Sequence, residues 1–194
     1  MSKRLILGLF ICMAACQMAV PAYLIYREES TLRHGKVFRF RAAPFDPADA
    51  FRGRYVALRL EAAQVKSPGA QTMVWKEPVF ATIEVEPDGY ARFSGVTRQR
   101  PEGKDFVHAT VSYGGENKLR LNLPFTRYYL NERLAPEAET AYREHSRRET
   151  RDAYVTVRVL SGHAALEELY IAGVPVKEYL KNAAKEAKPD AANR

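Results

Sequence analysis

Cysteine is missing from almost the whole chain. The 194 residues include two cysteines, Cys12 and Cys16, and both lie close to the N-terminus. Residues 27–194 therefore form no disulfide and contain no thiolate metal ligand or cysteine nucleophile. The two cysteines are four positions apart, so a helix places them on one face, where packing is the simplest role.

Recognisable catalytic and cofactor-binding motifs are missing as well. No two of the histidines have the spacing of zinc ligands: His34, His108, His145 and His163. There is no G-x-S-x-G elbow, and no glycine-rich loop leads into a helix. We therefore expect no metal and no cofactor. A Ser/Lys hydrolase stays open, because such a pair is recognised only by geometry. Its candidate serines are Ser67, Ser94, Ser112 and Ser161.

Charge is absent from one long N-terminal run. From Leu5 to Tyr26 the chain has 22 residues without a charged side chain. A helix of that length spans roughly 33 Å, which exceeds a hydrocarbon core of about 30 Å. Gln17 and Pro21 are compatible with such a helix, because membrane helices tolerate some polar residues and proline. We expect one membrane-spanning helix here, followed by a polar juxtamembrane segment at residues 27–35.

Two other interpretations of the apolar run remain open. A cleavable signal peptide would be cut after the small-residue site Val20-Pro21-Ala22, and a lipoprotein would be modified at Cys16. The run is longer than the core of about 7–15 residues in a typical cleaved signal, which favours an uncleaved anchor. It also stays apolar after Cys16, where a lipoprotein normally becomes polar.

The charges around the run bear on orientation. Lys3 and Arg4 precede it and indicate a cytoplasmic N-terminus, although basic residues also follow it. Long domains cross membranes largely regardless of charge, so we expect a single-pass protein of the bacterial inner membrane with a periplasmic body. The net charge of +7 falls to +5 for the body when Lys3 and Arg4 are left out. This mildly basic body suits an anionic lipid surface, but mixed charges are also ordinary on a solvated surface.

Alternation of apolar and polar residues predicts a mainly β body. The clearest hairpin joins residues 79–86 to residues 90–97 through Pro87-Asp88-Gly89, because proline and glycine favour the dihedral angles of a turn. A second hairpin joins residues 106–113 to 118–123, and residues 125–130 are expected to extend it. Further strands are predicted at residues 37–41, 54–61, 153–160 and 166–171.

Helices are predicted at residues 135–148 and 176–187. The first has an acidic start and a basic end, as the helix dipole favours, and few apolar residues, so we expect it on the surface. The predicted fold class is an N-terminal transmembrane helix followed by an antiparallel β barrel or sandwich with one or two peripheral helices. The expected organisation is an anchor at residues 1–27, a β domain at residues 28–180, and a helical end with a flexible tail at residues 181–194.

A short motif lies in residues 41–61, RAAPFDPADAFRGRYVALRLE. It combines a P-x-D-P step with an R-G-x-Y-x-x-L pattern, formed by Pro44, Asp46, Pro47, Arg52, Gly53, Tyr55 and Leu58. These patterns resemble the GDYXXLXY family of bacterial proteins, whose second pattern reads R-G-D-Y-x-x-L-x-Y. The chain departs from the family at Arg54, where aspartate is usual, and at Leu60, where tyrosine is usual.

The resemblance extends more weakly through residues 125–129 to Pro175. It implies a membrane-anchored protein of unassigned biochemical role, with a polytopic membrane protein as a partner. The residues also have a direct physical interpretation. Gly53 ends a turn and Asp46 accepts hydrogen bonds from it, while Leu58 faces the core. Tyr55 lies on the opposite face of the strand, where it can meet a helix, a loop or a partner.

A second candidate interaction surface consists of Arg127, Tyr128 and Tyr129. Aromatic residues beside arginine can stack on bases or sugars, but such a run is more often core packing with an extended arginine. We expect no nucleic-acid partner for a periplasmic body. The sequence predicts a non-enzymatic accessory or interaction protein of an envelope complex. An envelope hydrolase with an unrecognised site and a barrel that binds a small ligand are the alternatives.

Overall fold

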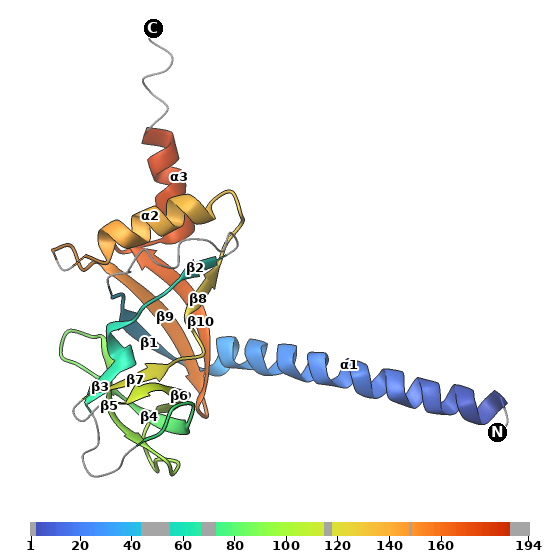
Figure 1. The fold of residues 1–194 in the computed structure, drawn as a ribbon. Helices are drawn as coiled ribbons and strands as arrows, with labels where there is room; N and C mark the ends of the chain where they lie inside the picture. Colours follow the sequence, from blue (N-terminus) through green and yellow to red (C-terminus); the bar gives the residue numbers. More distant parts are fainter. Residues whose placement is uncertain (1–2, 44–54, 67–72, 115–117, 148, 187–194) are drawn as a thin grey trace, which may run out of the picture.

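A single long helix projects from a β body (Figure 1). The computed structural model describes residues 3–43, 55–66, 73–114, 118–147 and 149–186. Helix α1 (Lys3–His34) has 32 residues, and in this part of the chain it is the one helix long and apolar enough to cross a membrane. Its most apolar 18-residue window is 0% buried, so this stretch packs against nothing in the protein. Such exposure suits a helix that faces lipid.

Helix α1 continues past the predicted span. The predicted juxtamembrane segment at residues 27–34 is helical, and the boundary placed at residue 27 falls inside α1. Contacts four residues apart stabilise this extension: the Thr31 hydroxyl donates to the Arg27 carbonyl (2.9 Å), and Arg33 pairs with Glu29 (2.7 Å). Thr31 is also 1% exposed, because the end of the helix packs on the body.

The first sheet contains the two ends of the body sequence. Its four antiparallel strands follow the order β1-β9-β10-β11, namely β1 (Lys36–Arg41), β9 (Ala153–Leu160), β10 (His163–Ile171) and β11 (Val174–Pro175). Strand β9 is central, and Val155 and Val157 on it are fully buried. The predicted strands at 37–41, 153–160 and 166–171 are confirmed.

The second sheet contains both predicted hairpins. Its five antiparallel strands follow the order β3-β7-β6-β4-β5, namely β3 (Gln64–Lys66), β4 (Pro78–Val85), β5 (Ala91–Thr97), β6 (Phe106–Gly114) and β7 (Lys118–Asn122). Strands β4 and β5 pair from Phe80↔Thr97 to Val85↔Ala91 around the Pro87-Asp88-Gly89 turn. Gly89 has a φ of +82°, which glycine adopts without strain.

A third, two-stranded sheet differs from the prediction. Strand β8 (Arg127–Tyr129) pairs with β2 (Tyr55–Ala57) and does not extend the β6–β7 hairpin. Pro124 lies just after β7 and has no N–H to donate, which accounts for the break. The predicted strand at 54–61 is also shorter, since a 3-10 helix, η2 (Glu61–Ala63), follows β2. Val56, Leu58 and Leu60 are nevertheless all buried, as their alternation predicted.

Together the sheets form a nearly closed barrel. The amide of His108 on β6 donates to the Gly162 carbonyl in the β9–β10 turn (3.0 Å), and a bridge joins Ala42 to Leu60. Phe40, which is 0% exposed, contacts Phe93 at 5.4 Å and Phe125 at 5.5 Å between ring centroids. Large side chains therefore fill the barrel at this level.

Two further helices lie together at one end of the barrel (Figure 1). They are α2 (Ala135–His145) and α3 (Val176–Glu186). Helix α2 packs on the barrel more closely than its sparse apolar content predicted, because Ala138, Ala141 and Tyr142 are all buried. In α3, Val176 and Leu180 are the buried residues that face the body. Small residues let α2 approach the strands closely, and Tyr142 adds one of the largest fully buried side chains of the protein.

Candidate functional site

Most of the motif lies outside the described residues. This applies to Pro44, Asp46, Pro47, Arg52, Gly53 and Arg54, whose predicted roles stay predictions. Tyr55 and Leu58 are described. Tyr55 opens strand β2 and is half-buried, whereas Leu58 is 4% exposed and belongs to the core.

The two short strands β2 and β8 present an aromatic surface. Tyr55 lies opposite Tyr129 in the register, and their rings meet edge to face with centroids 5.7 Å apart. The guanidinium of Arg127 lies 5.2 Å from the centroid of the Tyr55 ring. Tyr129 is 65% exposed. We call Tyr55, Arg127 and Tyr129 the β2–β8 surface; its three side chains order one another through ring and cation–π contacts.

Tyr128 is not part of this surface. It alternates with its neighbours on β8, so its side chain turns inward and is buried. Its hydroxyl donates to a carboxylate oxygen of Glu168 on β10, which also accepts from the amide of Leu169 (2.9 Å). Burial, followed by this contact with Glu168, raises the pKa of Tyr128 above its ordinary value. Tyr128 therefore joins β8 to β10, and only Arg127 and Tyr129 of the predicted trio are exposed.

Tyr142 on α2 holds the backbone that follows strand β2 of the motif. Its hydroxyl donates to the carbonyl of Arg59 (2.8 Å) and accepts from the Arg59 amide (3.1 Å). Arg59 follows Leu58, so α2 holds the backbone immediately after β2. Burial raises the pKa of Tyr142 above its ordinary value. Sequence analysis missed this residue, since no local pattern identifies which tyrosine will be buried.

A polar cleft of about 920 Å³ lies beside the motif segment. Arg59, Arg120 and Arg151 line it, and Arg151 pairs there with Glu61 (2.9 Å). Ser112 lines the cleft too, and a smaller cleft of about 300 Å³ contains both Ser94 and Lys66. Among the described residues, no hydrogen bond joins either serine to a lysine or histidine, so neither cleft supports a Ser/Lys pair.

A hydrogen-bonded chain of acid, histidine and hydroxyl lies between the two C-terminal helices. His145 Nδ1 is 2.8 Å from Asp152 Oδ1, and His145 Nε2 is 3.0 Å from the Tyr179 hydroxyl. Both ring nitrogens are thus occupied by structural partners. These hydrogen bonds join α2 to α3 and to the start of β9.

No group of three or more His, Cys, Asp or Glu side chains in the described part of the protein is arranged to hold a metal ion.

The junction between α1 and the body is a second site that sequence analysis missed. The Nε2 atom of His163, the first residue of β10, lies 2.9 Å from Glu28 Oε2 on α1. The neighbouring Gly162 has a φ of +88°, and a Cβ there would lie 2.3 Å from the Phe106 ring and 2.8 Å from His108 Nε2. Two sequence features mark this junction, Gly35 and the Ser161-Gly162 turn, but neither one identifies the element that packs against it.

The comparisons with known proteins identify the family. The model of the GDYXXLXY protein family matches residues 17–169, which cover most of the chain from the second half of the apolar run to β10. Comparisons with curated proteins and with solved structures gave no match. The biochemical role of this family is unknown, and its match extends through the β2–β8 surface and the junction with α1. The chain therefore belongs to the GDYXXLXY family, as residues 41–61 suggested.

Proposed function

We propose that this protein is a membrane-anchored accessory subunit that binds a polytopic membrane protein through the β2–β8 surface. The body lies on the periplasmic side of the bacterial inner membrane in this proposal. The observation that carries it is the pre-ordered group formed by half-buried Tyr55 and exposed Arg127 and Tyr129. Tyrosine and arginine are enriched among the residues that dominate binding energy at protein interfaces.

The supports beneath this surface favour a binding role. Tyr128 and Tyr142 tie β8 to β10 and the end of β2 to α2 through buried hydrogen bonds. A surface held in this way loses little conformational entropy when a partner binds. Helix α1 is also packed against the body through Thr31 and Gly35, so the surface has a fixed height and orientation relative to the membrane. A partner in the same membrane would meet it at that height.

In-cell photo-crosslinking tests this proposal directly. A photo-reactive amino acid replaces Tyr129 in the full-length protein, and Tyr113 serves as a matched control because it is also exposed (67%, against 65% for Tyr129). We expect Tyr129, but not Tyr113, to yield one discrete adduct with a protein that has several membrane spans. Adding Arg127→Glu should abolish this adduct while the protein level stays unchanged.

Three outcomes would contradict the proposal, two of them at position 129 itself. One is the absence of any adduct from position 129, and the other is the same set of adducts from positions 129 and 113. An adduct that persists in the Arg127→Glu variant would show that the β2–β8 surface does not recognise the captured protein.

A further inference from the structure

The last turns of α1 are fixed against the body. Thr31 is 1% exposed, and Gly35 packs so closely that a Cβ there would lie 2.5 Å from the Thr31 carbonyl and 3.0 Å from the Val159 amide nitrogen. Glu28 on the same helix pairs with His163 at the start of β10 (2.9 Å). The helix and the barrel thus form a continuous structure without a flexible linker at this point.

This contact sets the depth of the body relative to the membrane. Glu28 follows the last residue of the apolar run, Tyr26, by two positions, which is about 3 Å along a helix axis. The headgroup layer on each side of the hydrocarbon core is roughly 5–8 Å thick. When residues 5–26 span the membrane, Glu28 and the start of β10 that contacts it therefore lie at the depth of the lipid headgroups.

Positively charged groups gather at this depth. The Phe106 and His108 rings lie 5.7 Å apart against Gly162, whose neighbour His163 pairs with Glu28 on α1, the residue after Arg27. Burial lowers the pKa of His108, and the nearby Arg100 and Arg27 guanidinium groups lower it further. Arg27 is the first charged residue after the apolar run, and the Arg100 guanidinium lies 5.3 Å from the centroid of the Phe106 ring.

Two acidic groups near the junction are engaged in pairs. Glu28 is paired with His163, and Asp105 with Lys36 (3.0 Å). Arg27 and Arg100 are exposed, so their guanidinium groups are accessible to an anion from the membrane.

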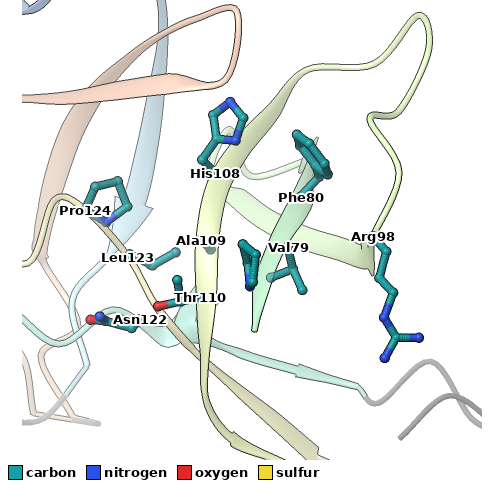
Figure 2. Close-up of a pocket in the computed structure, with 10 residues that line it drawn as sticks. Val79, Phe80, Arg98, His108, Ala109, Thr110, Asn122, Leu123 and Pro124 are labelled. Atoms are coloured by element: carbon teal, nitrogen blue, oxygen red, sulfur yellow. The ribbon is translucent and has the colours of Figure 1, made fainter. Parts of the chain in front are cut away.

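A cleft opens beside these charges. It has a volume of about 490 Å³ and runs along the outer face of β4 and β6, with His108 at one end (Figure 2). The rings of Phe80 and Pro124 provide apolar surface in it, and Thr110 and Asn122 provide polar groups. Phe80 packs against His108 with centroids 5.0 Å apart. The Phe80 ring also contacts the Phe106 ring (5.5 Å between centroids), beside which the Arg100 guanidinium lies, so the cleft suits a molecule with both an apolar and an anionic part.

We propose that this junction binds the phosphate headgroup of an anionic phospholipid. Arg27 and Arg100 contact the phosphate, because guanidinium groups bind phosphate oxygens through paired, charge-assisted hydrogen bonds. The glycerol part lies in the cleft against Phe80 and Pro124. The bound lipid holds the barrel on the membrane surface. This inference requires α1 to span a membrane, but it does not depend on the proposed protein partner.

Lipid retention by the full-length protein tests this site. The protein is placed in nanodiscs that contain equal amounts of phosphatidylcholine and phosphatidylglycerol, and native mass spectrometry then identifies the lipids that remain bound. We expect phosphatidylglycerol to be enriched about tenfold among them, as one or two charge-assisted contacts can supply. Combining Arg27→Gln with Arg100→Gln should remove most of this enrichment, and combining Arg27→Lys with Arg100→Lys should keep part of it.

The matched control combines Arg120→Gln with Arg147→Gln, which removes the same charge from exposed positions outside the junction. This control should retain phosphatidylglycerol as the wild type does. Full enrichment in the Arg27→Gln/Arg100→Gln variant would overturn the proposal, as would equal loss in both pairs, which would indicate unspecific charge attraction. An unchanged melting temperature shows that each variant is folded.

Discussion

The hydroxyl of Tyr142 holds both backbone polar groups of Arg59. It donates to the carbonyl at 2.8 Å and accepts from the amide at 3.1 Å, although the two residues are 83 positions apart in the sequence. The contact fastens α2 to the backbone that follows the exposed β2–β8 surface. It therefore connects the packing of the barrel end to the surface for which we propose a binding role.

Replacing Tyr142 with phenylalanine should reduce the stability of the body. The substitution keeps the ring but removes the three hydrogen bonds of the hydroxyl, with the Arg59 carbonyl, the Arg59 amide and the Ala43 carbonyl. We expect a loss of about 1–2 kcal/mol in the free energy of unfolding. Chemical denaturation of the full-length protein in detergent measures it. Tyr129→Phe is the control, because this ring is exposed and its change should stay within about 0.5 kcal/mol. Equal effects of the two variants would contradict a structural role for the Tyr142 hydroxyl.

Alanine at Gly162 should be far more harmful than alanine at Gly89. Both glycines have a positive φ, +88° and +82°, so the backbone strain of the two substitutions is similar. A Cβ at Gly89 meets nothing within 4 Å, whereas one at Gly162 lies 2.3 Å from the Phe106 ring. We expect about 1 kcal/mol of destabilisation at Gly89 and clearly more at Gly162.

Thermal unfolding of the two glycine variants makes this comparison. Similar melting temperatures would show that the β9–β10 turn can move away from β6 at little cost.

The protein should lose stability at alkaline pH. The pKa values of Tyr128 and Tyr142 are raised in the folded state, chiefly by burial, while tyrosine in the unfolded chain titrates near 10. The folded state therefore keeps protons that the unfolded state releases. The stability of the folded state that depends on protonated Tyr128 and Tyr142 is fully present below pH 10 and is lost as the pH rises above it. Melting temperatures measured between neutral pH and pH 11 should fall.

Lysine side chains also titrate in that range, so the comparison requires variants. Tyr142→Phe removes one of the two groups and should have a shallower alkaline decline than the wild type, whereas Tyr129→Phe should decline as the wild type does. An identical slope for the wild type and the Tyr142→Phe variant would contradict the burial argument.

The proposed periplasmic location can be measured with one cysteine. Cys12 and Cys16 are replaced by alanine, and a single cysteine replaces Lys177, which is exposed on α3. In cells whose outer membrane has been made permeable, a membrane-impermeant thiol reagent should label this position without lysis. Labelling only after lysis would place the body in the cytoplasm and would exclude the proposed orientation.

Local sequence patterns predicted the parts of the fold that depend on neighbouring residues. The hairpin over residues 79–97 follows from alternation and from the Pro87-Asp88-Gly89 turn, and the apolar run over residues 5–26 follows from its length and lack of charge. The motif identified the family because residue identity alone carries that information. The strand predicted at residues 125–130 nearly matches β8, but β8 pairs with β2 and not with the second hairpin. The apolar pattern of a strand specifies which face is buried and leaves the neighbouring strand unspecified.

Tertiary structure decided the features that join distant residues. The sequence by itself determined a β body behind one apolar helix, because periodicity and hydrophobicity are local properties. It did not determine that Glu28 pairs with His163, 135 positions away, or that Tyr128 points inward to Glu168 while Arg127 and Tyr129 remain outside. Such pairs form only when folding brings separate elements together, and each hydrogen bond then depends on the position of a backbone far along the chain.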